Sequence, residues 1–181
     1  ESATVAYVDI AYDVDAQKVV IVYRDDGNSY QGTAIVGTVS GTGISFGSSV
    51  VFESGTYGNS GITYDTTLDK VLISYSGPDS DGQVVTGTVS GTSISFESPV
   101  EFSDSSVGNT DIVYDTNSSK SVICYKDSGD SSKGKGLIYN PSSVTRPEVA
   151  DGKTATIQVG GSINTQQNAL TAGQQYFVQT D

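Results

Sequence analysis

Hydrophobic residues in this chain gather in short runs rich in Val, Ile and Tyr, as in Lys18–Asp25 and Thr33–Ser40. Stretches of Gly, Ser, Thr and Asp separate the runs, and none of the runs follows the helical period of about 3.6 residues. β-branched and aromatic residues pack well on a pleated sheet, whereas Gly and Asp favour tight turns. The pattern therefore predicts an all-β fold with many short strands.

The same pattern returns along the chain. The segment "IAYDVDAQKVVIVY" from Ile10 is matched by "ITYDTTLDKVLISY" from Ile62 and "IVYDTNSSKSVICY" from Ile112, 52 and then 50 residues apart. A second segment, "GTVSGTGISF" from Gly37, recurs as "GTVSGTSISF" from Gly87. A period in this range is typical of propeller blades. We therefore expect β-propeller-like repeat units of about 50 residues.

Each complete unit contains four strand-like runs joined by short links. In the first unit they lie near Val8–Asp13, Lys18–Asp25, Thr33–Ser40 and Ile44–Phe52. Short links favour antiparallel neighbours, so each unit is expected to form a four-stranded antiparallel meander. Pro99 interrupts the last run of the second unit, and because proline removes a ladder donor, this run is expected at the outer edge.

Two kinds of turn repeat with the units. The turn "VSGT" between the last two runs is expected to need a positive φ at Gly41 and at its equivalent Gly91. In the turn between the first two runs, an Asp is expected to accept hydrogen bonds from backbone N–H groups, and a Lys is expected to face it across the hairpin. These residues are Asp13, Asp65 and Asp115 with Lys18, Lys70 and Lys120.

The units end before the chain does. They span 1–52, 53–102 and 103–140, about two and three-quarter blades, because a third copy of the Gly37 segment, due near position 137, is absent. A Pro- and Ser-containing linker is predicted at 141–147 and a small β tail at 148–181, with strand-like runs "TATIQV" and "QYFVQ".

The second run of the first unit is apolar on both faces, with Val19, Ile21 and Tyr23 on one and Val20 and Val22 on the other. A sheet that is apolar on both faces is covered on both sides, which favours neighbouring sister sheets. Too few blades are present to close a ring, so the end sheets are expected to expose apolar faces. We therefore expect part of a longer chain, beginning mid-protein, that also forms a homo-oligomer.

The chain carries 9 basic and 21 acidic residues, a formal net charge of −12. Such a polyanion repels nucleic acid and anionic membrane surfaces, so neither is an expected partner. No apolar run is long enough for a membrane helix, so no membrane insertion is expected. Cys124 is the single cysteine, and we expect it to be a small buried thiol, because its equivalent in the first unit is Val22.

Enzymatic chemistry finds little support in the composition. The chain has no His, which excludes a Ser-His-Asp arrangement, and no Trp to line a sugar cleft. Arg24 and Arg146 are the only arginines, too few for a three-arginine sialidase pocket. We predict no catalytic residue. A glycan-cleaving enzyme that uses two of the many carboxylates is kept as a lesser alternative.

The loops between the second and third runs are the predicted binding surface, because they vary while the strands repeat. Each places Asp, Asn or Ser oxygens beside Gly. Asp79 and Asp81 form a D-x-D-G fragment of the kind that calcium accepts, although the full calcium loop is absent and turn chemistry explains the residues as well. No other cofactor is expected. The candidate binding residues are Asp25, Asp26, Asn28, Tyr30, Asp79, Asp81, Asp127 and Asp130.

The units "YDTNSSKSVICY" and "GTVSGTSISFESPVEF", with the tail "GKTATIQVGGSINTQQNALTAGQQYFVQTD", resemble repeat-bearing tail fibre or adhesin-like proteins of marine bacteriophages. The resemblance covers nearly the whole chain and implies a protein of the virion surface, outside the cell, with a role in host attachment. Host cell-surface glycans or proteins and other virion proteins are the partners it implies. A purely structural, self-assembling fibre, shaft or decoration subunit is the alternative.

Overall fold

The structure, a computed structural model, describes residues 4–139 and the short segments 158–159 and 162–163. The chain divides into two units, 1–139 and 140–181. In the second unit, β14 (Gln158–Val159) pairs with β15 (Ser162–Ile163) as an antiparallel ribbon. The predicted linker at 141–147 and most of the predicted tail at 148–181 lie outside the described residues.

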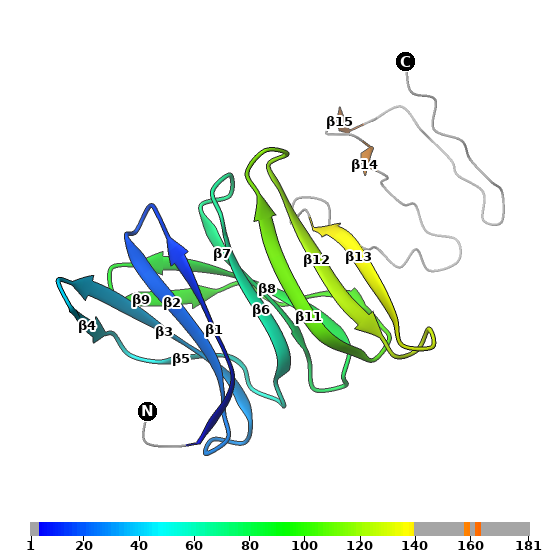
Figure 1. The fold of residues 1–181 in the computed structure, drawn as a ribbon, viewed down its shortest axis with the longest axis horizontal. Helices are drawn as coiled ribbons and strands as arrows, with labels where there is room; N and C mark the ends of the chain where they lie inside the picture. Colours follow the sequence, from blue (N-terminus) through cyan, green and yellow to red (C-terminus); the bar gives the residue numbers. More distant parts are fainter. Residues whose placement is uncertain (1–3, 140–157, 160–161, 164–181) are drawn as a thin grey trace. The chain divides into compact units, whose positions relative to one another are not determined.

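The first unit holds three antiparallel sheets, none of which closes on itself, and its described residues contain no helix (Figure 1). The all-β, antiparallel prediction is therefore confirmed. Sheet 1 comprises β1 (Val5–Asp13), β2 (Lys18–Asp25), β3 (Gln31–Ser40), β4 (Gly43–Phe46) and β5 (Val50–Glu53). Sheet 2 comprises β6 (Gly58–Asp65), β7 (Lys70–Ser76), β8 (Gly82–Ser90), β9 (Ser93–Phe96) and β10 (Val100–Ser103), and sheet 3 comprises β11 (Val107–Asp115), β12 (Lys120–Asp127) and β13 (Lys133–Tyr139).

The outermost strand of each complete sheet is broken into two, which corrects the predicted single fourth strand. In sheet 1 both β4 and β5 pair with β3, and in sheet 2 both β9 and β10 pair with β8. Between the halves, the Gly47 N–H donates to the Val36 carbonyl at 2.9 Å. Pro99 lies in the equivalent break of sheet 2, at the outer edge as predicted.

Both kinds of turn form largely as predicted. Gly41 and Gly91 have φ values of +59° and +62°, at the first loop position of the β3–β4 and β8–β9 hairpins. At the other turn, Asp65 accepts hydrogen bonds from the backbone N–H groups of Thr67 and Leu68. Lys70 pairs with Asp65 in backbone register, but its ammonium donates to the Thr88 hydroxyl at 2.7 Å and not to the carboxylate. The hairpin register is therefore right, and the ion pair is not.

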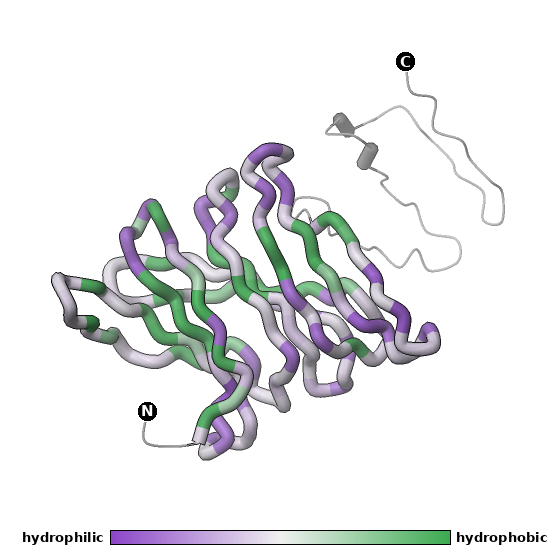
Figure 2. Tube along the Cα trace, viewed as in Figure 1, coloured by the Kyte–Doolittle hydropathy of each residue, from purple (hydrophilic) through white to green (hydrophobic). Residues whose placement is uncertain are grey.

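The core lies between sheets 1 and 2, where the hydrophobic runs of both sheets meet (Figure 2). Val20 and Val22 of β2 face Val71, Ile73 and Tyr75 of β7, and all five are buried. Leu72 and Ser74 point to the opposite side of β7 and are also buried, because sheet 3 covers that side. Cover on both faces was predicted for β2, but within residues 4–139 a sheet covers only one face of it, and Val19 and Ile21 stay partly exposed. The equivalent strand β7 is the one that is covered on both faces.

Within residues 4–139, each of the two end sheets has one face that no other sheet covers. Cross-strand partners point to the same side of a sheet, so Ile10, Ile21 and Ile35 share one face with Tyr12 and Val19. We call this surface the outer face of sheet 1; β4 adds two further apolar residues to it, Ile44 and Phe46. The open face of sheet 3 carries Asp111, Val113, Val122, Cys124 and Ile138.

Cys124 is exposed, so the prediction of a buried thiol is wrong. Its equivalents Val22 and Ser74 are both fully buried, because a further sheet covers their side of β2 and β7. Within residues 4–139, no sheet covers the corresponding side of β12. The strand pattern alone could not reveal this difference, because the three positions are equivalent within their units.

Candidate functional site

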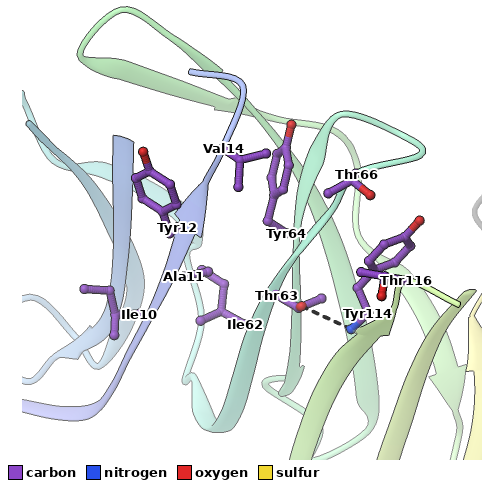
Figure 3. Close-up of a pocket in the computed structure, with 10 residues that line it drawn as sticks. All are labelled: Ile10, Ala11, Tyr12, Val14, Ile62, Thr63, Tyr64, Thr66, Tyr114 and Thr116. Carbon is purple, nitrogen blue, oxygen red and sulfur yellow. Dashed lines mark hydrogen bonds between the residues drawn. The ribbon is translucent and has the colours of Figure 1, made fainter. Parts of the chain in front are cut away.

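A groove of about 340 Å³ opens along the first strands of the three sheets (Figure 3). Strands β1, β6 and β11 lie side by side (Figure 1), and each contributes residues near its end. The equivalent tyrosines Tyr12, Tyr64 and Tyr114 stand one after another along the groove. The remaining lining residues are Ile10, Ala11, Val14, Ile62, Thr63, Thr66 and Thr116.

The first turn of each unit fixes one rim of the groove. Asp13 accepts hydrogen bonds from the N–H groups of Asp15 and Ala16 through the same oxygen, and Asp65 repeats this arrangement in the second turn. An Asp side chain that accepts from the amides ahead of it holds a turn in one conformation. Val14 and Thr66, each the residue after such an Asp, are thereby held at the rim.

Sheets 2 and 3 are bonded to each other beside the groove. The Tyr114 N–H donates to Thr63 Oγ1 at 3.2 Å, and the Tyr114 hydroxyl lies 2.6 Å from Thr67 Oγ1. Asp65 accepts a hydrogen bond at 3.0 Å from the hydroxyl of Ser121 in β12. Turn and strand of neighbouring sheets therefore form one connected surface, and the groove has fixed walls.

The two covered tyrosines differ in acidity. Burial raises the pKa of the Tyr64 hydroxyl, and the hydrogen bond that it donates to the Asp69 carboxylate raises it further. Hydrogen bonds from the hydroxyls of Thr66 and Thr67 lower the pKa of Tyr114. The ordinary pKa of a tyrosine is about 10, so Tyr64 stays protonated at neutral pH and donates a hydrogen bond within the groove wall.

The lining offers aromatic rings, aliphatic groups and hydroxyls, without a carboxylate, an ammonium or a guanidinium. Asp13 and Asp65 lie next to the groove, but both are buried and engaged by turn amides. Neutral hydroxyls and the half-exposed ring of Tyr12, next to the largely buried rings of Tyr64 and Tyr114, suit a ligand that is itself neutral and rich in hydroxyls. The lining as such supplies no acid–base pair for bond cleavage.

The candidates predicted in the first loop lie at the other end of the strands from the groove. Arg24 organises them: its guanidinium contacts Asp26 at 2.6 Å and lies over the rings of Tyr7 and Tyr30, at 4.7 and 5.1 Å from the ring centroids. Asp25 accepts a hydrogen bond from the Gly27 N–H. In the same loop, the Asn28 backbone N–H donates to the Asp25 carbonyl. These residues hold the loop together, with the Tyr30 ring half exposed.

The candidates in the third loop form a charge cluster. Lys135 lies 2.6 Å from an Asp127 oxygen and 3.4 Å from an Asp130 oxygen, and Lys133 also contacts Asp130. The Lys135 ammonium lowers the pKa of Asp127, and the Lys133 ammonium that of Asp130. These carboxylates are therefore ionised and matched by lysines at neutral pH.

In the second loop, Asp79 is exposed, and Asp81 accepts a hydrogen bond from the Gln83 side chain. Within residues 4–139, no three His, Cys, Asp or Glu side chains gather as a metal site would require. The eight predicted residues thus occupy three separate loops, each with its own contacts, and binding by them remains a prediction.

The groove itself was not among the predicted sites. Its signal was present, because a tyrosine recurs at 12, 64 and 114 with a Thr or Val two residues later. Repetition alone did not show that these side chains meet, since that depends on β1, β6 and β11 lying beside one another.

A comparison of the chain with protein families, with curated proteins and with solved structures gives no match in any of the three. In the part of the chain that the structure describes, no helix has the length and apolarity to cross a membrane. Function must therefore be argued from the groove, the loops and the uncovered sheet faces themselves.

Proposed function

We propose that the chain is a non-enzymatic surface protein of a virion, of tail fibre or receptor-binding type, which binds a host cell-surface glycan in the groove. The observation that carries the proposal is the repeated, uncharged lining, in which tyrosine rings alternate with threonine hydroxyls. Saccharides present hydroxyls and apolar C–H faces, and rings and hydroxyls are the groups that satisfy both.

The repeat also provides a way for weak binding in the groove to become strong. One groove of this open kind binds a single sugar weakly, but adjacent units present equivalent positions along the same surface. A polymer with repeated sugars engages several such positions at once, and linkage raises the effective concentration for each further contact. We therefore propose multivalent weak binding, with other virion proteins holding the chain outside the cell.

We further propose that the three sheets are consecutive blades of a propeller-like array. Two features support this reading: the first strands lie side by side, and the broken fourth strands form the outer edges. A groove along the first strands would then lie toward the axis of the array, where propellers commonly hold ligands.

The test uses the full chain on an array of neutral and acidic oligosaccharides. Thr66→Trp places a large ring in the groove at an exposed rim position and should reduce glycan binding about tenfold or more, since filling a pocket removes its ligand contacts. Thr42→Trp, in an exposed hairpin turn away from the groove, is the matched control. Binding that survives Thr66→Trp but is lost in Tyr30→Ala would assign recognition to the loops instead.

A self-assembling structural subunit is the second candidate, and it is favoured by the two uncovered apolar faces of sheets 1 and 3. It predicts concentration-dependent particles without preference for any sugar on the array. The third candidate is a glycan-cleaving enzyme. Incubation with host polysaccharide distinguishes it from the other two, because only an enzyme would release shortened saccharide products.

A further inference from the structure

The outer face of sheet 1 repeats the residues of a face that is covered elsewhere in the same chain. Ile10 and Tyr12 are 55% and 52% exposed, whereas their equivalents in sheet 2, Ile62 and Tyr64, are 8% and 9% exposed. On the outer strand, Ile44 is 46% exposed and its equivalent Ile94 is 4% exposed. Sheet 1 therefore presents, uncovered, the surface that sheet 2 buries against sheet 1.

The open face of sheet 3 carries the opposite half of the same contact. Its residues Val122 and Cys124 are the equivalents of Val20 and Val22, which cover sheet 2, and of Leu72 and Ser74, which are buried against sheet 3. Val113 and Ile138 add apolar area, at 60% and 65% exposure. One chain thus displays both complementary surfaces, each without a partner within residues 4–139.

We propose that these two faces bind each other between copies of the chain, so that sheet 3 of one copy packs on the outer face of sheet 1 of the next. The contact continues an arrangement that the chain already uses twice, from sheet 1 to sheet 2 and from sheet 2 to sheet 3. Because the two surfaces differ, the interface is heterologous, and it generates a filament or a closed ring.

The existing contacts predict which residues meet. Between sheets 2 and 3, the Thr110 hydroxyl donates to Ser74 Oγ at 3.1 Å. The repeat makes Val8 the equivalent of Thr110 and Cys124 the equivalent of Ser74. Both are exposed in the single chain. Cys124 of one copy therefore lies against Val8 of the next.

One feature of the contact between copies limits its affinity. Gly61 lies where sheets 2 and 3 approach closely, because a Cβ there would come within 2.7 Å of the Asp111 Cα. In the contact between copies, Asp111 takes the place of Gly61, and Asp9 takes the place of Asp111. Two carboxylates then meet at a position where each internal interface has one Asp and one Gly. The association is therefore expected to be weaker than the internal packing.

Disulfide trapping tests the predicted pair directly. A full-length Val8→Cys/Cys124→Ser variant is mixed with the unaltered chain under mild oxidation, so that each chain has one thiol. We expect a covalent heterodimer whose linked peptides contain positions 8 and 124, at a yield at least about tenfold above that of a matched control. The control is Asn28→Cys/Cys124→Ser, which places the thiol in an exposed loop.

Sedimentation of full-length variants gives a second reading that needs no cross-link. Ile44→Lys should weaken association about tenfold or more, because it places a charge at a position whose equivalent is buried in the internal interface. Val51→Lys is the matched control, because Val51 is 43% exposed on the same sheet and its equivalent Glu101 stays exposed. Asp111→Gly restores the Asp–Gly pair and should strengthen association.

Three results together support the interface: a heterodimer linked at positions 8 and 124, association that Ile44→Lys weakens but Val51→Lys does not, and association that Asp111→Gly strengthens. A chain that stays monomeric and yields no more heterodimer than the control overturns it, and so does self-association that Val51→Lys disrupts as strongly as Ile44→Lys. The result does not depend on glycan binding, because none of the substituted residues lines the groove.

Discussion

Sheets 1 and 2 have nearly the same sequence pattern but differ in what surrounds them. β7 is buried on both sides, between sheets 1 and 3, whereas β2 is covered on one side only, and its Val19 and Ile21 are partly exposed. The side chains on the outer face of sheet 1 and their equivalents in sheet 2 occupy the same register on the same scaffold. Burial in this molecule is therefore a property of position in the stack and not of the repeat unit.

The largest expected effect follows from Ile73 and its equivalent Ile21. Ile73 is fully buried between sheets, so Ile73→Ala should lower the free energy of unfolding by about 2–5 kcal/mol. Ile21→Ala removes the same atoms from a partly exposed face and should cost well under half as much. Urea denaturation at low protein concentration measures both, since self-association would otherwise protect Ile21. Equal costs would mean that the outer face is covered even in the single chain.

Gly87 and its equivalent Gly37 show how far the space around a residue, and not its place in the repeat, decides the cost of a substitution. A Cβ added at Gly87 would lie 2.8 Å from Ile94 Cδ1 and 2.9 Å from Phe96 Cε1. One added at Gly37 would lie 2.7 Å from Val19 Cγ2 and 2.8 Å from Ile44 Cδ1. Ile94 and Phe96 pack against the core and cannot move aside, so Gly87→Ala should destabilise by about 1–3 kcal/mol, the usual cost of overpacking.

Gly37→Ala should be milder, because Ile44 and Phe46 are about half exposed and can rotate away, and the partly exposed Val19 has room to shift. The reduced freedom of the unfolded chain even offsets part of the strain, by about 0.4–1 kcal/mol. Thermal unfolding of the two variants side by side gives the comparison. If Gly37→Ala were the more damaging of the two, the neighbours on the outer face would be as fixed as those in the core.

The sequence predicted what is local to one unit. The strand Lys18–Asp25 was predicted with the bounds that β2 has, and the Gly41 and Gly91 turns and the edge position of Pro99 were also correct. These features depend on residues that lie within a few positions of one another. The positive φ in a two-residue hairpin loop, which favours glycine, is one example.

What depends on contacts between units was harder to predict. Cys124 occupies the same place in its strand as Val22, yet it is exposed, because burial there requires a further sheet. The groove follows from the lateral contact of β1, β6 and β11, which no single unit specifies. The break at Gly47 was also missed, although Gly47, Ser48 and Ser49 separate the apolar residues on either side of it. That both halves pair with the same strand, β3, is not visible in the sequence.

The smallest expected effect compares the tyrosines of the two sheets. Tyr64 has a raised pKa because it is buried and donates to Asp69, so its folded pKa lies above the unfolded value of about 10. An acid with a raised pKa contributes stability that is fully present below pH of about 10 and is lost as the pH rises toward the folded pKa. Burial also raises the pKa values of Tyr57 and Tyr75.

Tyr64→Phe should therefore flatten part of the alkaline loss of stability, while at neutral pH it costs about 0.5–1.5 kcal/mol for the lost hydrogen bond. Tyr12→Phe is the matched control on the outer face, where the ring is half exposed, and it should change neutral stability by less. Urea midpoints at neutral and at alkaline pH measure both effects. A Tyr64→Phe variant whose alkaline loss equals that of the unaltered chain would mean that the Tyr64 phenol is solvated like Tyr12, and that sheet 2 is not held against sheet 1 at this end of the groove.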